Sequence, residues 1–583
     1  MLRRRKGLVA AGVLAIGGLV VGSAVYAVSP GFSDDRSAAL AAAINPEKPR
    51  NVILIIGDGT DDSIITAARN YELGAAGRFA LDELPFTGEM TTYGLKTGPG
   101  PKYPINYVSD SAPTASGWST GKKTVDSRLS QGPSSALEVP GDDYETVLEK
   151  YKKLGKRTGD VSTAELTDAT PAAAASHINA RTCQGPELDM SSCPTAKKSA
   201  GGKGAISEQL VDNQVDVLLG GGKNRFTQNI EPQSGGGTVL NYAQTKHKYR
   251  TVEDKAGLSA ITSLADGPVL GLFAPVNMTP RYKPLVATPA GKGGPDTRCE
   301  TAERGNQPTL ADMTDKAIKL LDNPAGFFLQ VESAMVDKQE HSSDICGAIG
   351  DVLEMDNALK VAQAYQAAHP DTLIIVTGDH AHSTQIVPNG ASATTDATGA
   401  TGGKATTTLK TADGDPMTVA YSTQPPNDPN ATPPISTSQS HTGSQIRVAA
   451  SGPQAANVTG TIDQTDLFAT LLGRTPSKLP SGPTTPPAAQ PKPAVAVVAD
   501  KTISAKSIRS RGLRISTSVA GATSVKVAIT KSGRTVASKT LGRYGRTFRL
   551  KVTPKVSGTV KIVVTATGPG GRTTKTTSAV VKR

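Results

Sequence analysis

Two stretches of this 583-residue sequence decide its fold: Asn51-Val-Ile-Leu-Ile-Ile56, which runs into Gly57-Asp58-Gly59, and Thr372-Leu-Ile-Ile-Val-Thr377, which runs into Gly378-Asp379-His380-Ala-His382. Each apolar run is continuous rather than alternating, as expected of strands that are buried on both faces of a parallel sheet. Ligand sites of such sheets lie beyond the carboxyl ends of the strands, so we expect Asp58, Asp379 and His380 to meet at one place. Taken alone, Gly-Asp-Gly is also an ordinary turn sequence.

The segments between such strands have helical character. Residues 314–323 and 349–369 show the 3.6-residue spacing of apolar side chains that is typical of helices. Buried strands that alternate with helices predict an α/β sandwich for the larger part of the chain. We expect the low-complexity stretches at 389–404 and 421–440 to be surface loops.

A third apolar run, Gly326-Phe-Phe-Leu-Gln-Val331, leads into residue types that bind metals. Glu332 ends the run, and Asp337 and His341 are four positions apart, so they share a face if the segment is helical. A carboxylate and an imidazole at this spacing suit zinc, whereas Glu332 and Asp58 with a hydroxyl suit a harder ion such as magnesium. The alternative is a helix surface with solvated charges.

The seven histidines of the sequence favour the metal site. His341, His380 and His441 lie beside strand ends or in Gly/Ser-rich turns together with aspartates, where imidazole ligands for two zinc ions would be needed. We interpret His247, in a lysine-rich stretch, and His369, near a helix end, as surface residues.

The segment Asp110-Ser111-Ala-Pro-Thr-Ala-Ser-Gly-Trp-Ser-Thr120 is expected to open a helix with Ser111 in its first turn. The free N–H groups and the positive dipole end of a helix favour a bound phosphate and an ionised hydroxyl, which makes Ser111 a candidate nucleophile. A serine that only caps the helix would have the same sequence context.

Charge divides the chain into two unlike parts. The formal net charge is +12, yet residues 500–583 hold 19 Lys or Arg and one acidic residue, so this tail carries +18 and residues 1–499 carry −6. Seven prolines between Thr475 and Ala494 predict a semi-rigid linker. Beyond it, alternating runs predict a small Ig-like β-sandwich over 495–583. These runs are Val525-Lys-Val-Ala-Ile529, Thr547-Phe-Arg-Leu-Lys-Val552 and Val560-Lys-Ile-Val-Val564, with a turn at Lys531-Ser-Gly-Arg534.

A basic module with almost no acidic residues suggests a polyanionic partner. An anionic cell-wall or surface polymer, lipid headgroups or DNA would each complement it, and we expect no specific nucleic acid partner. The alternative is a soluble surface whose charge has no specific partner. If the sandwich were the functional part, the protein would be a non-enzymatic surface protein.

The N-terminus has the features of an export signal. Met1-Leu-Arg-Arg-Arg-Lys6 precedes an apolar run that extends to about Val28 and contains a small-residue cleavage site at Val25-Tyr-Ala27. The run in residues 1–28 is also long enough for an uncleaved anchor, and residues 29–49 form a short segment before the first strand. Export would make the protein secreted, periplasmic or cell-surface associated. Four cysteines without C-x-x-C spacing favour two disulfides over a thiolate zinc site.

Six strings of the sequence carry a family resemblance. They are Ile56-Gly-Asp-Gly59, Asp110-Ser-Ala112, Ser162-Thr-Ala-Glu-Leu-Thr-Asp-Ala-Thr-Pro171, Gln330-Val-Glu-Ser-Ala-Met-Val-Asp-Lys-Gln-Glu-His341, Thr377-Gly-Asp-His-Ala-His382 and His441-Thr-Gly-Ser-Gln445. In order and spacing they resemble the bacterial alkaline phosphatases over residues 50–474. The resemblance implies a three-layer α/β/α sandwich with a large, mostly parallel central sheet. It also implies a metal-dependent phosphomonoesterase that acts through a phosphoserine intermediate at Ser111.

Carried over to this sequence, the resemblance implies a site with two zinc ions and one magnesium ion. Zinc one would bind Asp337, His341 and His441, and zinc two would bind Asp58, Asp379 and His380. The magnesium would bind Asp58, Thr170 and Glu332, with Asp168 acting through water. Arg181 would grip two phosphate oxygens, Lys338 would reach the phosphate through water, and His382 would orient Asp337. We expect the disulfides Cys183–Cys193 and Cys299–Cys346, which correspond to the family's two, and the resemblance implies a homodimer.

Sulfatases and phosphodiesterases of the same superfamily are the nearest alternatives among enzymes. Ser111-Ala-Pro113-Thr-Ala115 lacks the arginine of the sulfatase nucleophile motif, and Arg181 would occupy the space of a second ester group. Asp168 and Lys338 are histidines in the animal relatives, so their identity points to the bacterial, magnesium-containing type. We therefore expect small phosphate monoesters as substrates.

Overall fold

The computed structural model describes residues 35–232, 235–390, 404–424, 437–475, 492–542 and 545–583. The chain forms two compact units, residues 1–475 and 476–583. The predicted signal or anchor at 1–28 lies outside the described residues, as do most of the predicted linker and most of both low-complexity stretches. Within the described ranges, no helix is long and apolar enough to cross a membrane.

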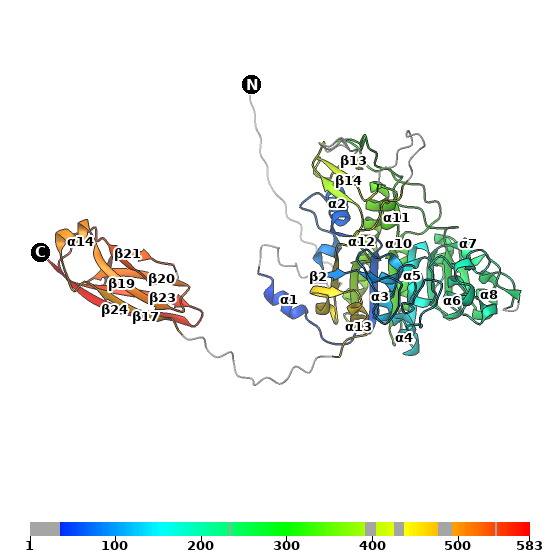
Figure 1. The fold of residues 1–583 in the computed structure, drawn as a ribbon, viewed down its shortest axis with the longest axis horizontal. Coiled ribbons are helices and arrows are strands. Elements are labelled where there is room, and N and C mark those ends of the chain that lie inside the picture. The colour runs from blue at the N-terminus through cyan, green and yellow to red at the C-terminus, as the bar shows by residue number, and fades with distance from the viewer. Residues whose placement is uncertain (1–34, 233–234, 391–403, 425–436, 476–491, 543–544) are drawn as a thin grey trace, which may run out of the picture. The chain divides into compact units, whose positions relative to one another are not determined.

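A ten-stranded sheet forms the middle layer of the larger unit (Figure 1). Its strands, in order across the sheet, are β16 (Gly460–Asp463), β2 (Phe86–Thr91), β15 (Ile446–Ser451), β11 (Thr372–Gly378), β1 (Asn51–Gly57), β10 (Phe327–Ser333), β5 (Arg157–Glu165), β6 (Val217–Gly221), β8 (Val269–Leu272) and β7 (Arg250–Val252). Among these described strands, β15 alone runs antiparallel to its neighbours, β11 and β2. Every residue of β1 and β11 is buried, as their continuous apolar sequence predicted. The prediction of a mostly parallel central sheet is confirmed.

Helices cover both faces of this sheet because alternate residues of each strand point to opposite sides. Ile53 and Ile55 of β1 belong to one core, and Val52 and Leu54 belong to the other. The first core is closed by α2 (Asp62–Leu73), α10 (Leu310–Leu321) and α12 (Ile345–Ala368). The second is closed by α3 (Ser111–Thr120), α4 (Val147–Lys153), α5 (Ala169–Ala175), α6 (Ile206–Asp212) and α8 (Val239–His247). The three-layer α/β/α architecture is thereby confirmed.

Both helices predicted from apolar spacing begin four residues earlier than expected, at Leu310 and Ile345. The reason is capping. Thr309 accepts a hydrogen bond from the N–H of Asp312, and Asp344 accepts from two N–H groups of α12. These polar caps start the helices before the periodic apolar residues begin.

The larger unit contains several smaller elements. These are α1 (Ser37–Ala43), α7 (Lys223–Phe226), α9 (Lys255–Ala260), α11 (Met335–His341), α13 (Asp466–Leu471), a sheet of β12 (Gln385–Val387), β14 (Pro416–Tyr421), β13 (Ala405–Lys410) and β9 (Lys292–Gly293), and the pair β3 (Gly94–Leu95) and β4 (Ile105–Asn106). Disulfides join Cys183 to Cys193 and Cys299 to Cys346, as predicted.

The C-terminal unit consists of two sheets around one core. One sheet holds β17 (Ala494–Ala499), β19 (Leu513–Ala520) and β22 (Thr547–Leu550), and the other holds β18 (Thr502–Ser504), β24 (Gly571–Lys582), β23 (Gly558–Gly568), β20 (Ser524–Lys531) and β21 (Arg534–Thr540). A short helix, α14 (Ala505–Ser510), connects them. Val525, Val527 and Ile529 are buried and alternate with outward-facing residues, as predicted. The expected turn closes the hairpin between β20 and β21, with positive φ at Ser532 and Gly533.

Candidate metal centre

Parallel strands deliver acidic residues to one edge of the central sheet. Gly57, the last residue of β1, pairs in register with Gly378, the last residue of β11. Asp58 and Asp379 follow directly, so their carboxylates emerge next to each other. Gly378 permits this close approach, because a Cβ on it would lie 2.3 Å from the carbonyl oxygen of Thr60.

Asp337 on α11 is the centre of a cluster with three histidines. Its Oδ1 lies 3.3 Å from Nε2 of His341, 3.3 Å from Nε2 of His382 and 3.2 Å from Nε2 of His441. That oxygen is buried and has no hydrogen-bond partner. Nε2 of His341 and Nε2 of His441 also lie 3.1 Å apart, and ligand atoms that converge in this way suit a shared cation. His382, predicted only to orient Asp337, lies as close to that carboxylate as the two predicted zinc ligands do.

Backbone carbonyls orient the imidazoles of this cluster. Nδ1 of His341 bonds to the carbonyl oxygen of Gln439, and Nδ1 of His441 bonds to that of Ser109 over 3.0 Å. A proton on Nδ1 leaves the lone pair of Nε2 free, which is the form of histidine that binds a metal ion. Sequence reasoning missed these carbonyl groups, and no signal could have revealed them, because every residue type supplies one.

A second group shares Asp337 with the first and adds Asp58 and His380. Nε2 of His380 lies 3.5 Å from Asp58 Oδ1, 3.3 Å from Asp379 Oδ2 and 4.0 Å from Asp337 Oδ1. The backbone N–H groups of Gly59 and His380 each donate to Oδ1 of Asp379 over 2.8 Å, which fixes that carboxylate. The predicted trio of Asp58, Asp379 and His380 is therefore brought together.

Ser111 is within hydrogen-bonding distance of this second group. It is the first residue of α3, and its Oγ lies 3.3 Å from Asp58 Oδ1 and 3.3 Å from His380 Nε2. The cap of α3 is Asp110, whose carboxylate accepts from the N–H of Ala112. The reading of Ser111 as a cap is thus wrong, and its hydroxyl lies at the positive end of the helix beside two possible metal ligands.

The residues expected to bind magnesium lie on β10 and α5. Glu332 is buried and accepts a hydrogen bond from Ser162 Oγ on the neighbouring strand β5. Oγ1 of Thr170 is buried without a hydrogen-bond partner. An orphaned hydroxyl beside a buried carboxylate is the kind of oxygen donor that a hard cation uses.

Asp168 holds the two basic residues of the site. Its Oδ2 lies 2.5 Å from Lys338 Nζ, and its Oδ1 lies 2.6 Å from Arg181 Nη2. Burial alone would raise the pKa of Asp168, but the two cations hold it well below its usual range. Because the protein itself neutralises Asp168, this carboxylate differs from the others in the site.

Burial gives the remaining carboxylates unusual acidities. Loss of water, reinforced by neighbouring carboxylates, raises the pKa of Asp58 well above its usual range, that of Asp379 to about 6 and that of Glu332 to about 8. Burial acts on Asp337 in the same direction, but the surrounding imidazoles hold its pKa well below the usual range. So many buried acids around one space require positive charge, which divalent cations supply.

The other histidines lie away from this centre. His177 is buried, with its ring nitrogens on Glu149 Oε1 (2.9 Å) and the carbonyl of Ser130 (3.0 Å). His247 lies 3.1 Å from Asp212 and only 11% of its side chain is exposed, so its interpretation as a surface residue is wrong.

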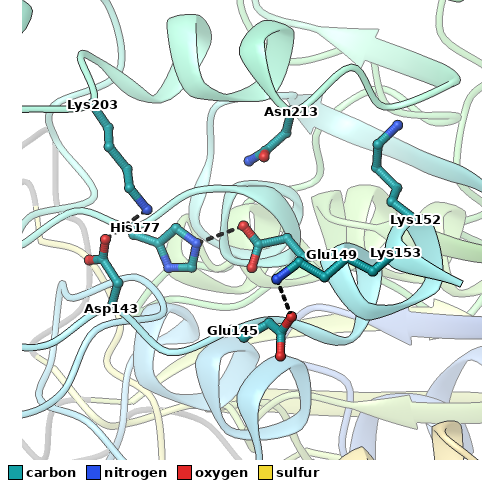
Figure 2. A pocket seen from close by; sticks show the side chains of 8 residues that line it. All are labelled: Asp143, Glu145, Glu149, Lys152, Lys153, His177, Lys203 and Asn213. Carbon is teal, nitrogen blue, oxygen red and sulfur yellow. Dashed lines mark hydrogen bonds and ion pairs between the residues drawn. The ribbon is translucent and has the colours of Figure 1, made fainter.

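A pocket of about 360 Å³ lies beside His177 (Figure 2). Its lining consists of Asp143, Glu145, Glu149, Lys152, Lys153, His177, Lys203 and Asn213. Lys203 pairs with Asp143 over 2.7 Å and Lys153 pairs with Glu145 over 2.6 Å. The pocket shares no residue with the metal centre, and its charges largely neutralise one another.

The fold and the metal centre together define a metal-dependent hydrolase of the α/β class. Comparison with known proteins gives the family within that class. The model of the alkaline phosphatase family matches residues 49–473, and the chain belongs to this family. It is a metal-dependent phosphomonoesterase.

Relatives with known names cover most of this region. The alkaline phosphatase of Escherichia coli (strain K12) is 43% identical over 446 residues, which are 76% of this chain and 89% of the relative. Streptomycin-6-phosphate phosphatase of Streptomyces griseus is 39% identical over 472 residues, 78% of this chain and 96% of the relative. The solved structure of Thermus thermophilus alkaline phosphatase superposes with a TM-score of 0.52 at 20% identity, covering 76% of this chain and 95% of that one, which supports the fold.

Removal of divalent cations should make stability strongly dependent on pH. In the unfolded chain the carboxyls of Asp379 and Glu332 have pKa values of about 4, whereas in the folded protein the pKa is about 6 for Asp379 and about 8 for Glu332. The folded state therefore becomes less stable relative to the unfolded state as pH rises from about 4 through these folded values. Bound cations would neutralise the carboxylates in place of protons and remove this loss of stability. Urea unfolding of chelated protein should therefore show lower stability at pH 8 than at pH 5, and zinc with magnesium should abolish the difference. The same pH dependence in chelated and metal-loaded protein would contradict this account.

Proposed function

We propose that Ser111 is the nucleophile of this phosphomonoesterase. The observation that carries the proposal is the position of its Oγ, 3.3 Å from both Asp58 Oδ1 and His380 Nε2 at the N-terminus of α3. A serine hydroxyl is a weak nucleophile at neutral pH and needs activation. The free N–H groups of the first helical turn favour an anionic phosphate at the same place.

We further propose two zinc ions and one magnesium ion, held by the ligand sets that the family resemblance implies. Asp337, His341 and His441 would hold the first zinc, Asp58, Asp379 and His380 the second, and Asp58, Thr170 and Glu332 the magnesium, with Asp168 acting through water. The unpartnered Asp337 Oδ1 and Thr170 Oγ1 support these assignments. When bound, such cations lower the pKa of a coordinated hydroxyl or water and stabilise anionic oxygens. The role of His382 would be to orient Asp337 or to complete the cluster around it.

The reaction then follows from the side chains at the site. Ser111 Oγ attacks phosphorus, the bond between phosphorus and the alcohol oxygen breaks, the alcohol oxygen takes up the proton that the serine loses, and a phosphoserine forms. Water next attacks the phosphorus, the bond to Oγ breaks, a proton from the water passes to Oγ, and inorganic phosphate leaves. Arg181 presents a planar fork to two phosphate oxygens, and Lys338 adds a second positive charge. Asp168 keeps both basic groups in place before substrate binds.

Substrate recognition in this proposal is confined to the phosphate. Arg181, Lys338 and the helix terminus all address phosphate oxygens, and no proposed ligand addresses the alcohol. Small phosphate monoesters of varied alcohols are therefore the expected substrates. A diester would bring a second ester group against Arg181, which disfavours it.

Ser111→Ala should lower turnover of p-nitrophenyl phosphate by about 10³-fold or more, because it removes the attacking atom. Ser119→Ala is the matched control: Ser119 lies on the same helix, and its buried Oγ has no hydrogen-bond partner. Metal analysis of both variants should give unchanged zinc and magnesium. A Ser111→Ala enzyme that still accumulates ³²P-labelled phosphoenzyme would refute the assignment.

We also infer export and a homodimer. The N-terminal sequence and the two disulfides support export, since disulfides persist in oxidising compartments, and the family resemblance supports the dimer. N-terminal sequencing of protein recovered outside the cytoplasm should begin near residue 28, and sedimentation equilibrium should give twice the chain mass. An intact Met1 would instead identify an uncleaved anchor, and a single-chain mass would exclude the dimer.

For the C-terminal unit we propose retention on an anionic surface polymer with repeating phosphodiester groups. In its described residues no ion pair neutralises a lysine or arginine. Arg514 on β19 lies directly opposite Arg549 on β22, and both are exposed. Like charges in this position destabilise a sheet, so an anionic ligand would relieve them.

Arg511, Arg514 and Arg549 form an arginine cluster at one end of the smaller sheet. Arg549 Nη1 donates to the carbonyl oxygen of Gly512 over 3.1 Å, and Arg511 Nη2 donates to Ser507 Oγ over 3.1 Å. Neutral acceptors thus fix two guanidinium groups without cancelling their charge, which lowers the entropy lost on binding. Paired guanidinium groups with free N–H donors favour phosphate oxygens as ligands.

Replacing Arg514 and Arg549 together by glutamine should lower the salt concentration that elutes the full chain from immobilised poly(glycerol phosphate). The control replaces Lys526 and Lys561 by glutamine. These lysines are exposed on β20 and β23 of the larger sheet, and their replacement removes as much positive charge as replacement of the two arginines does. Turnover of p-nitrophenyl phosphate should be unchanged in both variants. Equal weakening by both pairs would mean a diffuse charge effect, and stronger binding to anionic lipid vesicles or to DNA would overturn the choice of polymer.

A further inference from the structure

We infer that Gln330 is a positioning residue of the phosphatase site, which joins the helix of Ser111 to the backbone that carries Thr170. Gln330 lies on β10 two residues before Glu332, so both side chains are on the same face of the strand. It is fully buried. The inference rests on the magnesium ligands proposed above.

The carboxamide of Gln330 makes three hydrogen bonds to three different elements. Its Oε1 accepts from Trp118 Nε1 on α3 over 3.3 Å. Its Nε2 donates to the carbonyl oxygen of Thr170 on α5 over 3.0 Å and to Asp160 Oδ1 on β5 over 3.3 Å. All these partners are buried. A broken bond in such an interior leaves an unsatisfied polar group, so the carboxamide fixes the three elements relative to β10.

Gln330 bonds to the backbone carbonyl of Thr170, so the hydroxyl of Thr170 remains available to a metal ion. The carbonyl oxygen of Thr170 is held by Gln330 while its Oγ1 has no partner. On β10, Glu332 lies two residues after Gln330, and it accepts a hydrogen bond from Ser162 on β5. In the pairing of these strands Gln330 lies opposite Asp160, and Glu332 lies opposite Ser162. Neighbouring groups on the same two strands therefore hold both Thr170 and Glu332, the two oxygen donors that flank the magnesium position.

The bond to Trp118 connects this arrangement to the nucleophile. Trp118 lies on α3 seven residues after Ser111, about two helical turns away. It is the chain's one tryptophan, so the intrinsic emission of the protein reports on this contact. Magnesium that binds beside Thr170 should change that emission through Gln330.

Gln330→Met keeps the volume of the side chain and removes its hydrogen bonds. We expect it to weaken magnesium binding to zinc-loaded protein by about 10- to 100-fold, measured by equilibrium dialysis, as removal of outer partners of metal ligands does. Turnover should recover as magnesium is raised, and the change in Trp118 emission should shift to the same higher concentrations.

Asn51→Leu is the matched control. Asn51 is a buried carboxamide at the opposite end of β1, where its Nδ2 donates to Thr372 Oγ1 over 3.2 Å and to Tyr365 over 3.3 Å. It should lower the unfolding temperature and leave magnesium affinity unchanged. If Gln330→Met also lowers only the unfolding temperature, its bonds merely satisfy buried groups and the inference is wrong. If zinc-loaded protein without substitutions binds no magnesium in dialysis, the proposed magnesium site is wrong. The inference about Gln330, which rests on that site, is then wrong as well.

Discussion

Several carboxylates that share one space without water are the constraint on which the rest of this structure depends. Asp58, Asp337, Asp379 and Glu332 are all buried, and Asp58 interacts electrostatically with the other three, so the group repels itself unless positive charge is supplied. The chain supplies that charge in two ways. At Asp168 it uses its own lysine and arginine, and elsewhere it leaves unpartnered oxygens and inward-turned imidazoles that suit divalent cations.

The topology of the sheet brings three of these charged residues together. Adjacent parallel strands end at the same edge, so one acidic residue at or just beyond the end of each of three strands brings Asp58, Asp379 and Glu332 together. At Asp379 the hydrogen bonds that hold the carboxylate come from the backbone N–H groups of Gly59 and His380, so they do not depend on the identity of nearby side chains. Under the proposed function, the nucleophile Ser111 comes from α3, Lys338 comes from α11 and Arg181 comes from a turn beyond α5.

Sequence reasoning reached the parts of the structure that depend on local pattern. Continuous apolar runs predicted β1 and β11, and the i,i+4 spacing placed Asp337 and His341 on one face of α11, as the structure shows. It missed what depends on register and on the backbone. The partial burial of His247 and the carbonyl groups behind the imidazoles follow from how distant segments meet, whereas the contact of His382 with Asp337 was expected from the family resemblance. Helix starts were also misplaced, since the capping residues are polar and lie outside the apolar period.

The two units of the chain present opposite kinds of electrostatics. In the larger unit, charge is buried and compensated at short range, whereas in the smaller unit the guanidinium groups of Arg511 and Arg549 donate to neutral oxygens. Arginine stays protonated throughout the range in which proteins remain folded, and a phosphodiester keeps its single negative charge over the same range. Binding through such groups would be independent of pH and dependent on ionic strength. The enzyme would therefore stay bound at low salt concentration and dissociate at high salt concentration.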